Sequence, residues 1–205
     1  MLRVALTGGL AAGKSTVSAH LRRLGFPVAD ADRLAREAVA PGTQGLAAVA
    51  ELFGPGVLTT AGELDRAALA RLVFADPAAR RRLESVVHPL VRSAGAKLAE
   101  AARAAGAKAV IFDIPLLVET GQAGDFDLVV SVAAPEELRT ARALARGLTP
   151  EQVRGRLAAQ ASEAERAAAA DIVLDGSGTV AGLEAQVESV LVPAIACSRV
   201  RPNAG

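Results

Sequence analysis

Short apolar runs recur along the chain, and longer stretches of helical periodicity separate them. Several runs are continuous rather than alternating, which is typical of strands that helices cover on both faces. Because strands alternate with helices, the pattern predicts an α/β fold with a doubly wound, parallel, five-stranded sheet. The predicted strands are LRVALT (2–7), PVAD (27–30), KAVIFD (108–113), FDLVVSV (126–132) and DIVLD (171–175).

The interval between the second and third runs is too long for a single crossover helix. Its start is punctuated by the turn-forming pairs Pro41-Gly42 and Pro55-Gly56. We therefore expect a helical insert over residues 43–105, in which an acceptor substrate binds. The apolar spacing predicts its helices at 43–53, 65–75 and 77–105.

A proline interrupts the last of these predicted helices. His88 precedes Pro89, and the residue before a proline is disfavoured in helical geometry. Proline itself is favoured at a first helical position. The pair therefore predicts that the helix restarts at Pro89.

The remaining segments complete a single predicted domain. Residues 135–168, between the fourth and fifth strands, are Arg-rich and helical in pattern, and we expect them to form a lid. The end of the chain, 196–205, is expected to be a flexible tail. The core of the domain then comprises residues 1–42, 106–134 and 169–195.

Composition narrows the functional classes. A chain of 205 residues suggests one domain, and 51% hydrophobic with 22% charged residues is usual for a soluble globular protein. The net charge of +1 gives no reason to expect nucleic acid or an anionic membrane as a partner. We therefore expect neither nucleic acid nor a membrane as a partner. A monomer is expected, with an oligomer left open.

Cysteine content and the apolar runs indicate the compartment. The single cysteine, Cys197, excludes an internal disulfide framework and a cysteine-based metal site, and it fits a reducing environment. The apolar run in the first residues is too short for a signal peptide. AVIFDIPLLV is cut by Asp113, so no membrane-spanning helix is expected. The predicted location is cytoplasmic.

The stretch TGGLAAGKST, residues 7–16, has the spacing Gly-x-x-x-x-Gly-Lys-Ser. It follows a predicted strand and opens a helix, which is the context of a phosphate-binding loop (P-loop). Backbone N–H groups and the helix N-terminus would hold phosphates, Lys14 would bridge the β- and γ-phosphates, and Ser15 would ligate Mg²⁺. Ala11 is expected to fit if its φ angle stays negative. The predicted ATP-binding residues are Gly9, Leu10, Ala11, Ala12, Gly13, Lys14, Ser15 and Thr16.

The phosphate loop alone does not distinguish a kinase from a motor or a switch.

An acidic pair, Asp30 and Asp32 in VADAD, ends the second strand. If the chain is still extended, both carboxylates point to one side, at the sheet edge where ligands bind. One of them could accept a proton from an attacking hydroxyl. The alternative is that they cap the helix that follows.

The third strand also ends in an acid. In AVIFDIPLLVE (109–119), Asp113 is placed to hold Mg²⁺ through water, and a carboxylate in so apolar a run needs a partner. Leu116 and Leu117 are expected to line the wall of a substrate site. Glu119 is either functional or simply exposed.

These motifs together resemble one family. GGLAAGKST, DADRLAR, HPLVR (88–92), DIPLLVE and the LAAQAS–ER stretch (157–166) occur in the order seen in dephospho-coenzyme A kinases. The similarity covers residues 2 to about 190. It implies a P-loop kinase fold and transfer of the γ-phosphate of ATP, with Mg²⁺, to the ribose 3′-hydroxyl of dephospho-coenzyme A, the last step of coenzyme A synthesis.

The resemblance also implies residue roles. Asp32 is the implied base, with Asp30 beside it, and His88 and Arg92 are implied to bind the acceptor. Arg142 and Arg146, four apart in the lid, are implied to contact ATP, and Arg142 with Lys14 to stabilise the transferring phosphoryl group. Gly176 stands where the family usually has asparagine, which weakens any assignment of an adenine contact there.

Two other classes remain as alternatives. One is another P-loop kinase of a small metabolite, such as a nucleoside monophosphate, shikimate or gluconate. HPLVR and the long insert argue against it. The other is a nucleotide-dependent switch. A guanine switch needs an Asn-Lys-x-Asp motif, and the only asparagine in the chain is Asn203.

Overall fold

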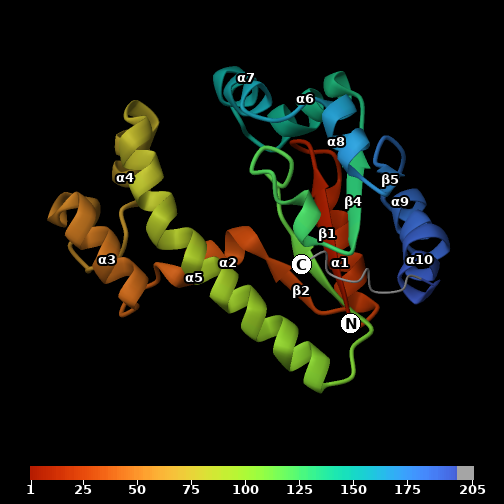
Figure 1. Ribbon diagram of the computed structural model, residues 1–205. Helices are drawn as coiled ribbons and strands as arrows, with labels where there is room; N and C mark the ends of the chain where they lie inside the picture. The colour runs from red at the N-terminus through yellow and green to blue at the C-terminus, as the bar shows by residue number, and fades with distance from the viewer. Residues whose placement is uncertain (198–205) are drawn as a thin grey trace. The chain divides into compact units, whose positions relative to one another are not determined.

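A parallel sheet of five strands organises the fold, and its strand order is β2-β3-β1-β4-β5 (Figure 1). The computed structural model describes residues 1–197. The predicted sheet and its strands are confirmed to within about two residues. The strands are β1 (Leu2–Gly8), β2 (Val28–Asp30), β3 (Ala109–Asp113), β4 (Leu128–Ala133) and β5 (Ile172–Asp175).

The register of the central strands brings three strand ends together. Strand β1 pairs in parallel with β3, where Leu6 lies opposite Asp113. On its other side β1 pairs with β4, where Gly8 lies opposite Val132. The loop that leaves β1 therefore emerges between the carboxyl ends of β3 and β4, which is where ligands bind in open α/β sheets.

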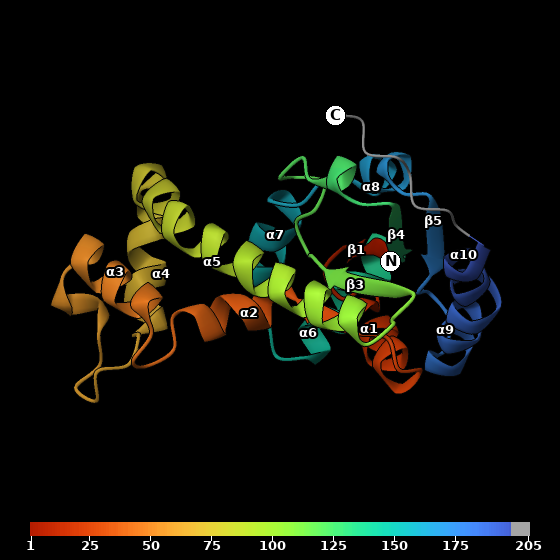
Figure 2. The ribbon, with the colours of Figure 1, turned by 60° about the horizontal axis from the view of Figure 1, so that its bottom comes forward.

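Helices cover both faces of the sheet. On one face, α1 (Lys14–Arg23) and α9 (Val180–Gln186) pack on each other (Figure 2). A π-helical turn (Val187–Leu191) and α10 (Val192–Cys197) continue from α9. On the opposite face, α8 (Glu163–Ala169) lies against β4. The larger core includes the buried side chains of Val4, Leu6, Val17, Leu21, Val130, Leu174, Leu183, Val187, Leu191 and Ile195.

The stretch Val180–Cys197 is apolar and long enough to cross a membrane by length and composition alone, with a mean hydropathy of 1.4. Within it, the buried residues Leu183, Val187, Leu191 and Ile195 recur every four positions and belong to the core of the sheet. Packing against the sheet therefore accounts for its apolar face.

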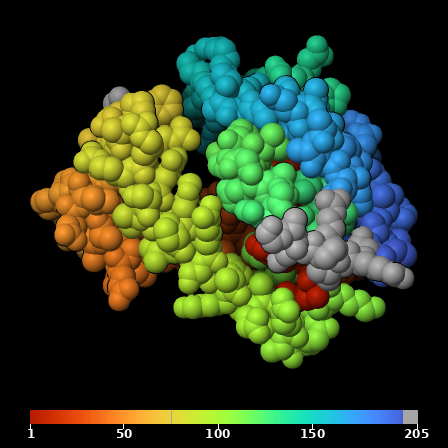
Figure 3. All heavy atoms as spheres, in the orientation of Figure 1, coloured from red at the N-terminus to blue at the C-terminus, as the bar shows by residue number. Residues whose placement is uncertain are grey.

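The lid segment consists of three helices after β4. They are α6 (Glu136–Ala145), α7 (Pro150–Ala158) and α8. In the space-filling view these helices, teal to light blue, adjoin the green β3–β4 connection (Figure 3). The contact includes a hydrogen bond of 2.7 Å from the Ala161 backbone N–H to Oε1 of Glu119.

The chain divides into two compact units, which we describe separately. The sheet unit comprises Met1–Ala29 and the chain from Ala99 onward, and the helical unit comprises Asp30–Leu98. The helical unit has its own core, built on Val39, Val49, Val57 and Leu69. Its helices are α2 (Ala31–Ala38), α3 (Gln44–Phe53), a 3₁₀ turn (Pro55–Val57), α4 (Arg66–Ala75) and most of α5 (Pro77–Ala104).

The prediction that a helix restarts at Pro89 is wrong. Helix α5 runs without a break from Pro77 to Ala104, with Pro89 inside it. Proline removes the hydrogen bond that its N–H would donate to Ser85, a loss of about 3 kcal/mol or more in a helix interior. Packing of Leu83, Val86 and Val87 against the core of the helical unit on the preceding turns keeps the helix continuous.

Candidate functional site

The phosphate loop leaves β1 at Gly8 and enters α1 at Lys14, as the motif predicts. Gly8 has a φ of 155°, and a Cβ there would lie 2.7 Å from the carbonyl oxygen of Val132. Gly13 has a φ of 116°, a conformation that other residues rarely adopt. Both motif glycines therefore occupy backbone positions that a side chain would disturb.

Ala11 corrects one expectation about this loop. Its φ is +56°, and it is the one non-glycine residue with a positive φ in the described part of the chain. The condition of a negative φ, on which the expected fit of Ala11 rested, is therefore not met. A left-handed conformation costs a residue with a Cβ about 1–2 kcal/mol. The loop takes its shape in spite of the alanine, and the neighbouring contacts must offset that cost.

The neighbouring contacts come from the loop after β5. Gly176 donates its N–H to the carbonyl of Ala133 at 2.7 Å. A Cβ on Gly176 would lie only 1.9 Å from the carbonyl oxygen of Ala12. Gly176 therefore allows the backbone of this loop to support the phosphate loop, and no other residue fits without a backbone shift.

A buried charged pair closes the floor of the site. Lys14 Nζ forms an ion pair with Oδ1 of Asp113, and the hydroxyl of Ser18 donates to Oδ2 of the same carboxylate. Asp113 is 4% exposed, so the expected need for a partner is met twice. Sequence reasoning missed Ser18. The signal was its position four residues after Lys14, on the same face of α1.

The oxygen donors at this floor suit a magnesium ion that a nucleotide brings with it. The Ser15 side chain is exposed, and Asp113 supplies a carboxylate. Hydroxyl and carboxylate oxygens, completed by water and phosphate, are the donors that Mg²⁺ prefers. In residues 1–197 no group of three or more His, Cys, Asp or Glu side chains could hold a metal by itself.

Two buried arginines approach the first residue of the loop. Arg139 of α6 is 4% exposed and Arg166 of α8 is 2% exposed. A Cβ on Gly9 would lie 2.6 Å from Nη1 of Arg139 and 2.9 Å from Nη2 of Arg166. The spacing of Arg139 from Arg142 and Arg146 in the sequence suggests that the three could clamp developing charge on a γ-phosphoryl group, a role that stays a prediction. Arg166 was not among the predicted site residues, and the available signal was the ER pair inside the LAAQAS–ER stretch.

The predicted lid arginines lie elsewhere. Arg142 donates through Nη1 to the carbonyl of Gly176 at 2.7 Å, with longer contacts to Ser177 and Gly178. Arg146 is exposed at the end of α6. Arg142 thus contacts the loop after β5, and its predicted role toward ATP stays a prediction, as does that of Arg146.

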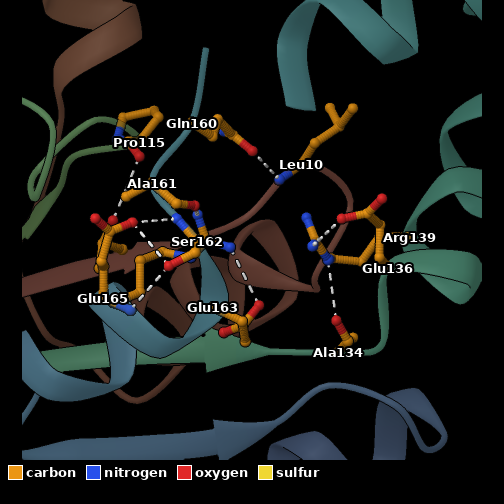
Figure 4. A network of polar contacts seen from close by, with 12 residues as sticks. Leu10, Pro115, Ala134, Glu136, Arg139, Gln160, Ala161, Ser162, Glu163 and Glu165 are labelled. Carbon is orange, nitrogen blue, oxygen red and sulfur yellow. Dashed lines mark hydrogen bonds and ion pairs between the residues drawn. The ribbon is translucent and has the colours of Figure 1, made fainter. Parts of the chain in front are cut away.

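The segment before α8 ties the lid to both neighbouring loops (Figure 4). Gln160 accepts from the backbone N–H of Leu10 in the phosphate loop at 2.9 Å. Glu119 accepts from Ala161, which gives Glu119 a structural contact. Ser162 caps α8, and its hydrogen bonds lower the pKa of Glu165 below the usual range.

The two predicted wall residues have different surroundings. Leu116 is 37% exposed, whereas Leu117 is fully buried in a second core with Ala5, Phe126 and Val129. The prediction that Leu117 lines a substrate site is therefore wrong. Its side chain fills the core on the lid face of the sheet, and only Leu116 keeps the predicted access.

In the helical unit, the acidic pair does not continue as a strand. Asp30 is the N-cap of α2 and accepts from the N–H of Arg33 at 3.0 Å, so the capping alternative holds for Asp30. Asp32 lies in the first turn of α2 with an exposed side chain. The two carboxylates are therefore not side by side on an extended strand.

The other predicted acceptor residues lie on the long helix. His88 and Arg92 are both exposed, four residues apart on α5, so they share one face of it. Their predicted role toward the acceptor stays a prediction.

Comparison with known proteins identifies the family. The family model described as dephospho-CoA kinase matches residues 2–182. The chain belongs to the dephospho-CoA kinase family. It is 50% identical over 190 residues to a dephospho-CoA kinase from Frankia casuarinae, covering 93% of this chain and 82% of that one. It is likewise 50% identical to a dephospho-CoA kinase from Streptomyces avermitilis, covering 93% and 92%.

Solved structures share the fold of this chain. A crystal structure from Thermus thermophilus is 41% identical, with a TM-score of 0.81, and the match covers 94% of this chain and 97% of that one. A shikimate kinase from Acinetobacter baumannii is 14% identical with a TM-score of 0.54, covering 94% of each chain, and so shares the fold alone. The predicted fold class and family are confirmed.

Proposed function

We propose that this chain transfers the terminal phosphoryl group of ATP to the ribose 3′-hydroxyl of dephospho-coenzyme A, giving coenzyme A and ADP. The observation that carries the proposal is the family match over residues 2–182. A second observation supports it: Lys14 of the phosphate loop forms an ion pair with Asp113, the residue that ends β3. The reaction is the last step of coenzyme A synthesis.

The donor half of the mechanism follows from the phosphate loop. Its N–H groups and the N-terminus of α1 attract the phosphates of ATP, because both present partial positive charge. Lys14 exchanges its contact with Asp113 for the β- and γ-phosphates and stabilises charge that moves to the leaving ADP. Arg142 would assist from the lid.

A bound Mg²⁺ would neutralise charge between the β- and γ-phosphates. Ser15 would ligate it directly, and Asp113 would hold it through water. Both supply hard oxygen ligands of the kind the ion requires. When Lys14 turns to the phosphates, Asp113 keeps the hydrogen bond from Ser18, which orients its carboxylate.

In the acceptor half of the mechanism, Asp32 is the proposed base. Its carboxylate accepts the proton of the 3′-hydroxyl as the oxygen forms its bond to the γ-phosphorus and the bond to the β–γ bridging oxygen breaks. His88 and Arg92, exposed on one face of α5, would bind the acceptor's phosphates. Asp30 and Leu116 complete the proposed acceptor residues. The helical insert, 43–105, is the proposed acceptor region and 135–168 the lid.

The proposed setting is that of a cytoplasmic enzyme of small-molecule metabolism. It would act as a monomer, without nucleic acid or membrane. The net charge of +1 and the single cysteine support this setting.

An acceptor panel tests the function directly. The protein is incubated with ATP, Mg²⁺ and dephospho-coenzyme A, shikimate, gluconate or a nucleoside monophosphate, and ADP release is followed. We expect ADP release that depends on dephospho-coenzyme A, with a product one phosphate heavier by mass spectrometry. Turnover with another acceptor instead would contradict the proposal.

A further inference from the structure

The side chain of Gln160 reaches from the lid segment to the phosphate loop. Its Oε1 accepts a hydrogen bond of 2.9 Å from the backbone N–H of Leu10, 150 positions away in the chain (Figure 4). A lid residue therefore holds a backbone group of the loop directly, without any ligand between them.

The peptide that Gln160 holds belongs to a tight turn. The N–H of Ala12 donates to the carbonyl of Gly9 at 3.1 Å, which closes a four-residue turn from Gly9 to Ala12. The Gly9 carbonyl and the Leu10 N–H belong to one peptide unit, so Ala12 and Gln160 hold this unit at both ends. Ala11, with a φ of +56°, occupies the third position of the turn, where a type II turn requires a positive φ and favours glycine.

The hydrogen bond from Leu10 to Gln160 works against the strain at Ala11. A left-handed alanine is unfavourable by an amount of the same order as the gain from one hydrogen bond. Without Gln160 as a partner, the turn could relieve this strain by adopting another shape. The N–H groups of the loop bind phosphates in one shape only, so a population that relaxes to another shape weakens the apparent affinity for ATP.

The backbone that carries Gln160 is itself fixed. The Ala161 N–H donates to Glu119 at 2.7 Å, and the Ala161 carbonyl accepts from Nη1 of Arg166. The Gln160 N–H donates to the carbonyl of Leu157 at 3.2 Å. Gln160 therefore presents its amide oxygen from an ordered segment, which lowers the entropy cost of holding the loop.

We propose that Gln160 is a positioning residue for the phosphate loop, because its hydrogen bond to Leu10 keeps the strained turn in the shape that binds the phosphates of ATP. The inference rests on the proposed function and concerns the shape of the loop, not a contact with the nucleotide. Since Gln160 already engages the Leu10 N–H, the N–H groups later in the loop are left to hold the phosphates.

Calorimetric titration with ATP and hydrogen exchange of the Leu10 amide, followed by NMR, test the proposal in the full chain. Gln160→Met removes the acceptor and keeps the length of the side chain. The matched control is Gln152→Met, because Gln152 is a second lid glutamine whose Oε1 accepts from a backbone N–H, that of Thr149 at 3.0 Å. Each substitution is also made together with Ala11→Gly, which removes the left-handed strain.

We expect Gln160→Met to weaken ATP binding about three- to tenfold, the equilibrium effect of one hydrogen bond, and to speed exchange of the Leu10 amide. Its melting temperature should fall no further than that of Gln152→Met, whereas Gln152→Met should bind ATP within about twofold of the wild type. Combined with Ala11→Gly, Gln160→Met should weaken ATP less than about twofold, since no strain is left for the hydrogen bond to offset.

Unchanged ATP affinity in Gln160→Met overturns the proposal. An equal loss with and without Ala11→Gly also overturns it, because Gln160 would then not act through the strained turn. If Gln160→Met does not fold, the wild-type Leu10 amide decides. Protection that persists when ATP is bound supports the proposal, and exchange as fast as that of an exposed amide overturns it.

The two proposals fail in different ways. If the wild-type protein phosphorylates dephospho-coenzyme A but Gln160→Met keeps its ATP affinity, only this inference fails. If Gln160→Met loses ATP affinity as expected but no turnover with dephospho-coenzyme A is found, the acceptor assignment fails and the role of Gln160 stands.

Discussion

The phosphate loop and the predicted acceptor residues are built in opposite ways. Around the loop, Asp113, Arg139 and Arg166 are buried and held by named partners. In the helical unit, Asp32, His88 and Arg92 are exposed on helices. The donor residues are thus fixed by the fold before a ligand arrives, whereas the acceptor residues carry little of the fold's stability.

This difference separates the effects of mutation. Substituting a residue around the loop should change stability and binding together, because the same contacts serve both. Substituting an exposed acceptor residue should change turnover or acceptor binding, with little effect on stability.

The largest effect is expected from Asp32→Asn. If Asp32 is the base, kcat should fall by about 10²–10⁴-fold, the usual contribution of a positioned base. The Kd for ATP should stay within about twofold, since a base acts in the chemical step. Stability should fall by only about 0.5 kcal/mol, from the lost charge at the start of α2. Stopped-flow turnover, calorimetry and thermal unfolding measure the three quantities.

Glu37→Gln is the matched control for Asp32→Asn. Glu37 is exposed on the same helix and pairs with Arg33 at 3.5 Å. It should leave turnover unchanged. A large loss of thermal stability in Asp32→Asn, in proportion to its lost activity, would mean that Asp32 supports the helix rather than the chemistry.

Gly176→Ala tests the donor side. The added Cβ would lie 1.9 Å from the Ala12 carbonyl, so the backbone must move. We expect a loss of about 1–3 kcal/mol in the free energy of unfolding, the range for overpacking. ATP affinity should fall with it, because Ala12 belongs to the phosphate loop. Urea unfolding and ATP titration measure the two effects.

Gly178→Ala provides the comparison for that experiment. A Cβ on Gly178 would meet nothing within 4 Å. The two variants should therefore differ in both stability and ATP affinity, although they are two residues apart in one loop. Equal behaviour would show that the contact between Gly176 and Ala12 does not support the site.

The smallest effect is expected from Ala11→Gly. Glycine removes a left-handed strain of about 1–2 kcal/mol and adds about 0.5–1 kcal/mol of unfolded-state entropy. The free energy of unfolding should therefore rise by about 0.5–1 kcal/mol, measured in urea. The same change at Ala19, inside α1, should instead lower it by about 1 kcal/mol. A loss at both positions would mean that Ala11 is not strained.

The sequence was sufficient for features that depend on local pattern. Buried strands leave continuous apolar runs, and the phosphate loop has a fixed spacing, so the sheet, the helical segments and the positions of Lys14 and Asp113 could be predicted. The capping by Asp30 was an open alternative for the same reason, because a cap is a local hydrogen bond.

Features that depend on distant contacts could not be read in this way. Arg166 is an ordinary member of an Arg-rich background until the fold brings it, with Arg139 from a separate helix, to Gly9. The positive φ of Ala11 depends on the loop around it, and Leu117 is buried by residues far along the chain. Local rules predict that Pro89 interrupts its helix, but tertiary packing overrides those rules and α5 continues through it.

The absence of a side chain at Gly9 has a consequence for mutational tolerance. The phosphate-loop motif leaves this position unspecified, so a motif search accepts any residue there. In this protein two buried arginines occupy the space that a side chain would need. A saturation scan should therefore find position 9 nearly as intolerant as the motif glycines. Substitutions there should regain part of the lost stability when Arg139 is shortened, because the shorter side chain frees the space that a Cβ at position 9 needs.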